Sequence, residues 1–236
     1  MSPHHKAGGR RCQRGSRIRR DMDPRGGALV AAWLLVGVFT LAGAGPATTQ
    51  PAPGATLRGA DLLAALRGGG FILYFRHADT DHSQSDRRMT GPEDCANQRN
   101  LSNRGREHAR AIGEAIRALG IPIGAVLASP LCRTVETAAL AFGAVEKAPA
   151  AREAGPVPPG TPGRYSALRT LLSTPVASGS NTVIVAHGYP YYTLVGGQYL
   201  EEGEADVVRP RGSDFEVVAR VGLAQWRGLA SGTPAR

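Results

Sequence analysis

The chain has 236 residues, of which 42% are hydrophobic and 20% are charged, so we expect one folded domain of ordinary size preceded by a tail. This composition excludes a collagen, a chain disordered throughout and a small disulfide scaffold. The net charge of +9 would suit a nucleic-acid binder, but residues 1–27 hold eight basic and two acidic side chains, a balance of +6. Because only +3 is left for the rest of the chain, we predict no nucleic-acid partner.

Residues 1–45 have the pattern of an export segment. Residues 26–45 carry no charge, follow the basic stretch and end in small residues, with Ala-Gly-Ala at 42–44 resembling a cleavage site, which is the order of regions in a secretory signal peptide. We therefore predict a periplasmic or extracellular protein, and Met22 as an alternative start to Met1. About 20 apolar residues can span a bilayer, so an uncleaved membrane anchor over 28–44 is a second hypothesis, and a buried core helix is a third.

A linker and one folded domain are predicted after this segment. Residues 46–58 (PATTQPAPGATLR) have the composition of a flexible linker, and the folded domain is expected over 59–230. Loss of the tail would leave two cysteines, Cys95 and Cys132. In an oxidising compartment such a pair favours a disulfide, although two unpaired buried thiols are the alternative.

The first half of the domain begins with a short predicted helix over 61–67, which a run of three glycines ends. The continuous apolar run at 71–75 (FILYF) is typical of a strand buried on both faces. Apolar residues then recur at helical spacing, so a helix is expected over 103–119, with Ser102 as its N-cap.

The second half adds more strands. A buried strand over 125–128 is followed by Ser129 and Pro130, which we expect to be the N-cap and first residue of the next helix. Three further strands are expected over 182–186, 206–209 and 215–221, the last two as a pair of edge strands. The alternation predicts an α/β fold, a three-layer α/β/α sandwich with a mainly parallel sheet. Ligands bind such sheets at the carboxyl ends of the strands.

The first three strands each run into residues suited to binding an anion. Arg76 and His77 follow the first strand, Arg133 lies near the start of the helix after the second, and His187 follows the third. Two guanidiniums and two imidazoles would bind phosphate oxygens, and one imidazole can attack phosphorus and hold the phosphoryl group covalently. Each residue alone could be a loop feature or a helix start, but three such strand ends in order favour a site.

Four segments resemble motifs of the histidine phosphatase superfamily, which has the phosphoglycerate-mutase-like fold. They are 75–78 (FRHA), 101–109 (LSNRGREHA), 129–138 (SPLCRTVETA) and 185–188 (VAHG). The resemblance covers about 71–188. It implies that His77 becomes a phosphohistidine, that Arg76, Arg133 and His187 bind the phosphoryl group, and that no metal or organic cofactor is needed.

The resemblance leaves the general acid open. In one branch the acid is a Glu downstream of the second-arginine helix, and Glu153 is the nearest match here, although it could be only a solvated loop carboxylate. In another branch an Asp directly follows the second His, which Gly188 excludes for this chain. Some compact members lack a dedicated acid. The short region after Glu153 favours a phosphatase over a mutase, and 95–102 (CANQRNLS) resembles small bacterial phosphatases.

The main prediction is therefore an exported, metal-independent phosphomonoester hydrolase acting on a phosphorylated substrate. One alternative is a phosphate-binding module of the same fold that lacks turnover. Another is a metal-dependent hydrolase, because His77, Asp79, Asp81 and His82 nearly form a binuclear metal signature, although Arg76 beside the first ligand would repel a cation. The tyrosine-rich segment 189–199 is expected either to line the mouth of the site or to pack as a helix.

Overall fold

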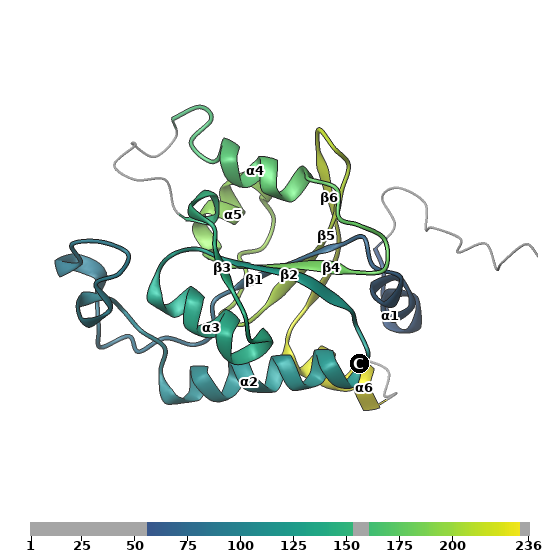
Figure 1. Cartoon of the computed structure of the whole chain (residues 1–236), viewed down its shortest axis with the longest axis horizontal. Helices are drawn as coiled ribbons and strands as arrows, with labels where there is room; N and C mark the ends of the chain where they lie inside the picture. The colour runs from purple at the N-terminus through teal and green to yellow at the C-terminus, as the bar shows by residue number, and fades with distance from the viewer. Residues whose placement is uncertain (1–55, 153–160, 232–236) are drawn as a thin grey trace, which may run out of the picture. The chain divides into compact units, whose positions relative to one another are not determined.

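A computed structural model of the chain describes residues 56–152 and 161–231 (Figure 1). The predicted export segment, nearly all of the predicted linker and Glu153 lie outside the described residues. Within the two described ranges, no helix has the length and hydropathy that crossing a bilayer requires. The hypothetical anchor over 28–44 is not among these residues.

A six-stranded sheet forms the middle layer, in the order β3-β2-β4-β1-β5-β6. Its strands are β1 (Ile72–Arg76), β2 (Ile123–Ala128), β3 (Glu146–Lys147), β4 (Asn181–Ala186), β5 (Ala205–Pro210) and β6 (Phe215–Val221). The strands β3, β2, β4 and β1 run parallel to one another, whereas β5 is antiparallel to both β1 and β6. In the register, Val185 of β4 is the partner of both Phe75 of β1 and Ala128 of β2. The carboxyl ends of these three strands therefore lie side by side at one edge.

Helices cover both faces of the sheet, as Figure 1 shows. One face carries α1 (Gly59–Gly68), α2 (Asn103–Ala118), α3 (Cys132–Phe142) and α6 (Leu223–Ser231), and the other carries α4 (Ser166–Ser173) and α5 (Gly188–Val195). Alternate side chains of each strand enter the two cores, so that Phe75 packs with Trp226 in one and Tyr74 packs with Tyr191 in the other. The predicted three-layer α/β/α class with a mainly parallel sheet is confirmed.

Burial of apolar side chains explains why the predicted strands form where the sequence places them. Leu73 and Tyr74 have no exposed surface, and Phe75 is almost fully buried. Burying a large apolar side chain contributes about 1.5–3 kcal/mol, so a run with partners on both faces favours the interior of the sheet. At the start of α2, the predicted cap is present, because the hydroxyl of Ser102 accepts a hydrogen bond from the N–H of Gly105 at 3.0 Å.

Two details of the prediction are wrong. The strand predicted over 206–209 as an edge strand is β5, which lies between β1 and β6. The interior position is tolerated because the buried carboxylate of Asp206 accepts hydrogen bonds from Arg220 of β6 at 2.8 and 2.9 Å. The helix expected to begin at Pro130, with Ser129 as its cap, starts two residues later, with Leu131 at the cap position and no side-chain cap.

Candidate active site

The carboxyl ends of β1 and β4 and the start of α3 bring together the four side chains that the sequence singled out. The imidazole rings of His77 and His187 lie 5.8 Å apart, edge to face. The guanidiniums of Arg76 and Arg133 are close enough to both rings to lower the pKa of each imidazole. Both imidazoles and Arg133 are buried. This arrangement provides two cations and two nitrogen bases around one point at the sheet edge.

His77 is held in one orientation by the end of its strand. Its backbone N–H donates to the carbonyl of Ala186 at 3.1 Å, and Nδ1 of its ring lies 3.0 Å from the carbonyl oxygen of Ala78. A carbonyl only accepts, so Nδ1 carries the hydrogen and Nε2 carries the free electron pair. Burial lowers the pKa of His77 to about 4, with Arg133 and Arg76 acting in the same direction and the Ala78 carbonyl and Glu202 opposing it. The ring is therefore a neutral base at neutral pH.

His187 is fixed by two contacts from other elements. The hydroxyl of Tyr74 donates to the backbone carbonyl of His187 at 2.8 Å, and Oγ of Ser129 lies 2.8 Å from Nε2 of its ring. Burial, followed by the charge of Arg133, keeps the pKa of His187 well below its usual value. The contact explains why Ser129 does not cap α3: its hydroxyl faces the imidazole instead of the helix N–H groups.

Both arginines of the site already have carboxylate partners. Arg76 donates to the carbonyl of Leu200 at 2.9 Å and to Oε1 of Glu202 at 3.2 Å. Arg133 donates to Oδ1 of Asp86 at 3.2 Å. An anion that binds between these guanidiniums therefore has to compete with, or rearrange, two carboxylates.

Glu202 is a site residue that the sequence analysis missed. It accepts hydrogen bonds from the backbone N–H of Thr80 at 2.9 Å and from its hydroxyl at 2.8 Å, and its Oε1 lies 4.0 Å from Nδ1 of His77. Burial raises the pKa of Glu202, but the two bonds from Thr80 and the nearby His77 and Arg76 outweigh burial, so that the pKa lies below its usual value. The carboxylate is therefore ionised.

Only the strand order of the sheet identifies Glu202 as a neighbour of His77. The sequence EEGE at 201–204 resembles any acidic turn. Because β5 runs antiparallel beside β1, with Ala205 opposite Phe75, the turn before β5 returns to the carboxyl end of β1. That neighbour could have been inferred only from the strand order.

The residues of the hypothetical metal signature have different polar partners, except that His77 and His82 both lie near Glu202. Oδ2 of Asp79 lies 2.6 Å from Nδ1 of His108, Asp81 accepts from Ser83, and Nε2 of His82 lies 3.8 Å from Glu202. Among the residues that the structure describes, no three His, Cys, Asp or Glu side chains gather as a set of metal ligands. The candidate general acid Glu153 lies outside the described residues.

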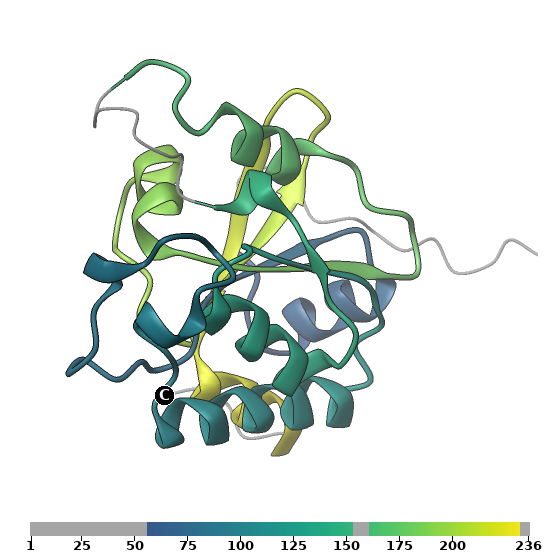
Figure 2. The same cartoon turned by 60° about the vertical axis from the view of Figure 1, so that its left-hand side comes forward.

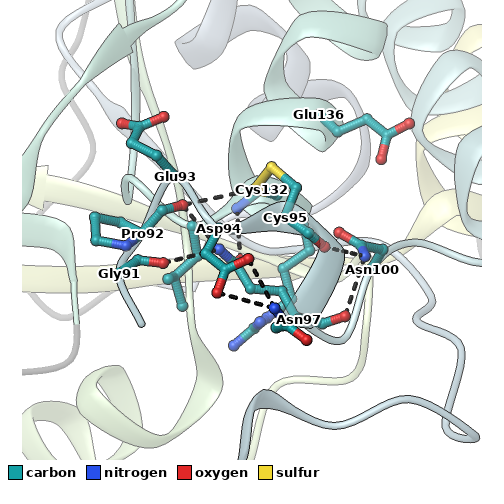
Figure 3. Close-up of a disulfide and its surroundings, with 12 residues drawn as sticks. Gly91, Pro92, Glu93, Asp94, Cys95, Asn97, Asn100, Cys132 and Glu136 are labelled. Atoms are coloured by element: carbon teal, nitrogen blue, oxygen red, sulfur yellow. Dashed lines mark hydrogen bonds between the residues drawn. A yellow bond between two sulfur atoms is a disulfide. The ribbon is translucent and has the colours of Figure 1, made fainter. Parts of the chain in front are cut away.

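A disulfide fastens the segment between β1 and α2 to the site. Cys95 is joined to Cys132, the first residue of α3, with the Cα atoms 5.7 Å apart (Figure 3). The side-chain oxygen of Gln98 accepts from the backbone N–H of Cys132 at 2.9 Å. This segment, at the left of Figure 2, also carries Asp86. The disulfide thus holds the partner of Arg133 close to Arg133 itself.

Residues 72–155 match the model of the histidine phosphatase superfamily (branch 1). No curated protein matches the chain.

Several solved structures are similar at low identity. A phosphoserine phosphatase variant from Entamoeba histolytica in complex with phosphoserine is 14% identical, with a TM-score of 0.45, covering 66% of this chain and 98% of that one. The protein histidine phosphatase SixA complexed with tungstate is 18% identical, with a TM-score of 0.42 and coverage of 65% and 97%. A mycobacterial glucosyl-3-phosphoglycerate phosphatase with inorganic phosphate is 17% identical, with a TM-score of 0.41 and coverage of 66% and 99%.

Proposed function

Because this chain belongs, through residues 72–155, to the histidine phosphatase superfamily (branch 1), we propose that it is a phosphomonoester hydrolase that works through a phosphohistidine on His77. The observation that carries this proposal is the buried, neutral imidazole of His77, with its hydrogen on Nδ1 and its free electron pair on Nε2. A neutral imidazole beside two guanidiniums is a nucleophile next to an anion-binding site.

In the first step, Nε2 of His77 attacks phosphorus, an N–P bond forms and the P–O bond to the alcohol breaks. The departing oxygen takes a proton from water or from Glu153, the acid suggested by the family resemblance. Arg76, Arg133 and His187 bind the phosphoryl oxygens, and charge-assisted bonds from such groups stabilise the charge spread over them in the transition state. Asp86 gives up its bond to Arg133 as the dianion enters.

In the second step, water attacks phosphorus and the N–P bond breaks. The electron pair returns to Nε2, the proton lost by water leaves with phosphate or solvent, and the products are one alcohol and one phosphate. Between the steps the imidazole bears a positive charge, since Nδ1 keeps its hydrogen. The Ala78 carbonyl at 3.0 Å and the carboxylate of Glu202 at 4.0 Å stabilise that charge.

The test is to trap the intermediate. The protein is incubated with 32P-labelled p-nitrophenyl phosphate and quenched in alkali, in which phosphohistidine survives and phosphoserine does not. We expect label on the wild type and none on His77→Ala, together with loss of turnover in that variant. Label that persists in His77→Ala would refute the role of His77, and absence of both label and turnover in the wild type would favour the phosphate-binding module.

Treatment with a metal chelator distinguishes the phosphohistidine route from the metal-dependent alternative. Turnover that survives prolonged EDTA treatment supports the phosphohistidine route, because its steps use only protein side chains and water. Turnover lost to EDTA and restored by Zn²⁺ would favour the hydrolase built on His77, Asp79, Asp81 and His82.

Export is a separate part of the proposal. It is supported by the uncharged segment 26–45 after a basic stretch. Expression of the full chain in a Gram-negative host, followed by fractionation and mass spectrometry of the N-terminus, tests it. A periplasmic product that begins near residue 45 supports cleavage, full-length protein in the membrane fraction supports an anchor over 28–44, and full-length soluble protein in the cytoplasm overturns export.

A further inference from the structure

Three exposed tyrosines lie in the segment that follows His187. Tyr189 and Tyr192 lie three residues apart on α5 and are 43% and 42% exposed, and Tyr199 in the following loop is 38% exposed. These are the only large hydrophobic side chains that are exposed in the part of the chain that the structure describes. By contrast, Tyr191 on the same helix is buried and stacks on Tyr74 with ring centroids 4.1 Å apart. The three exposed rings, called the tyrosine cluster below, are not needed to fill the core.

The tyrosine cluster adjoins the phosphoryl-binding groups through Tyr199, which contacts Arg76. The ring centre of Tyr199 lies 5.3 Å from the guanidinium carbon of Arg76, and 5.7 Å from the ring centre of Tyr192. Tyr199 also lies directly against Gly188, the residue after His187, where an added Cβ would be 2.5 Å from the ring. A group attached to a phosphate held by Arg76 and His187 would therefore meet the tyrosine cluster first.

We propose that the tyrosine cluster binds the leaving group of the substrate, and that this leaving group is an alcohol carrying a planar aromatic ring. The proposal rests on the phosphatase function proposed above. Aromatic rings gain about 0.5–1.5 kcal/mol from offset or edge-to-face pairs beyond the area they bury. The rings of Tyr192 and Tyr199 are tilted by 49° to each other, so a third flat ring can stack on one and meet the other at its edge.

The chemistry of the tyrosine cluster disfavours the other classes of leaving group. Three phenols offer no charge to a phosphorylated amino acid or a second phosphate, and the nearby guanidinium of Arg76 is assigned above to the phosphoryl group being transferred. A short aliphatic alcohol would leave the rings of the tyrosine cluster in water. An aromatic alcohol is the class that covers them.

The experiment compares benzyl, cyclohexylmethyl and ethyl phosphate. All three are esters of primary alcohols, so their leaving groups have similar basicity and differ in the ring. We expect kcat/KM for benzyl phosphate to exceed that for each of the other two by about 5- to 10-fold, the range that one or two aromatic pairs give. Tyr192→Leu should reduce this preference to less than about 2-fold, whereas Tyr192→Phe, which keeps the ring, should retain it.

The outcomes separate the two proposals. Equal kcat/KM for all three esters, or equal kcat/KM for benzyl and cyclohexylmethyl phosphate, would overturn the inference while leaving the phosphatase function intact. An aromatic preference unchanged in both Tyr192→Leu and Tyr189→Leu, with both variants folded by circular dichroism, would also overturn it. No hydrolysis of any ester, together with no labelled His77, would instead overturn the proposed function.

Discussion

Oγ of Ser129 lies 2.8 Å from Nε2 of His187, although the two residues are 58 positions apart in the chain. They meet because β2 and β4 are parallel neighbours, and because the N–H of Ser129 continues the strand pairing by donating to Val185 at 2.9 Å. The hydroxyl sets the orientation of an imidazole that has few other polar contacts.

The first prediction concerns this contact. Ser129→Ala should lower kcat/KM for p-nitrophenyl phosphate by about 5- to 150-fold, since a lost bond to a buried polar group costs about 1–3 kcal/mol. Ser129→Thr keeps the hydroxyl and should lose less. Steady-state kinetics measure the effect, and an alanine variant as active as the wild type would show that Ser129 does not position His187.

Substitution of Arg133 tests whether its guanidinium binds the phosphoryl group. Arg133→Ala should lower kcat/KM by at least about 100-fold, because a donor aimed at a developing negative charge contributes about 3 kcal/mol or more. Arg133→Lys keeps the charge but loses the planar fork and should recover only part of the activity. Arg106→Ala is the matched control, as Arg106 pairs with Glu136 at 2.7 Å and not with the site. Near-native turnover in Arg133→Ala would refute its role.

The role of Glu202 can be tested by comparing its glutamine variant with the same substitution at Glu201. Glu202→Gln removes the charge beside Nδ1 of His77 and weakens the bonds to Arg76 and Thr80, so we expect kcat to fall by about 10-fold, the equivalent of about 1.4 kcal/mol. The control is Glu201→Gln, an exposed carboxylate one residue away. Quenched-flow measurement should show slower formation of the phosphoenzyme in Glu202→Gln alone; equal rates in both variants would contradict a role in positioning.

The protonation of His77 gives a pH prediction. NMR titration of its ring should show a midpoint near pH 4 in the folded protein, against about 6.5 in urea. Because the unfolded chain binds this proton more readily, the free energy of unfolding should fall as the pH is lowered from 6.5 towards 4. The His77→Asn variant should show a smaller fall. A folded midpoint at or above 6.5 would mean that burial does not keep the ring neutral.

The disulfide can be tested by reduction. Replacing Cys95 and Cys132 with serine should cost about 3–4 kcal/mol in the free energy of unfolding, the value expected for closing a loop over the 37 positions between them. The KM should also rise, because the segment that holds Asp86 near Arg133 is released. Dithiothreitol should reproduce both effects in the wild type and change nothing in the double variant; unchanged melting in all cases would contradict a structural disulfide.

The sequence predicted the parts of the fold that depend on local pattern. Apolar runs such as 71–75 fixed the parallel strands, and the Arg and His residues that follow them could be assigned to one edge. Contacts that depend on strand order could not be assigned. Glu202 reaches His77 only because β5 lies beside β1, and Ser129 faces His187 only because β2 lies beside β4. The helices α4 and α6, of eight and nine residues, were missed because each is shorter than the window over which helical periodicity is read.

The contact between Gly188 and Tyr199 limits how this site can evolve. A carboxylate directly after His187 would require a Cβ that overlaps the Tyr199 ring, so an acid at that position requires the Tyr199 side chain to move. A proton donor at position 188 is therefore compatible with this fold only if the Tyr199 ring is displaced or replaced by a smaller side chain.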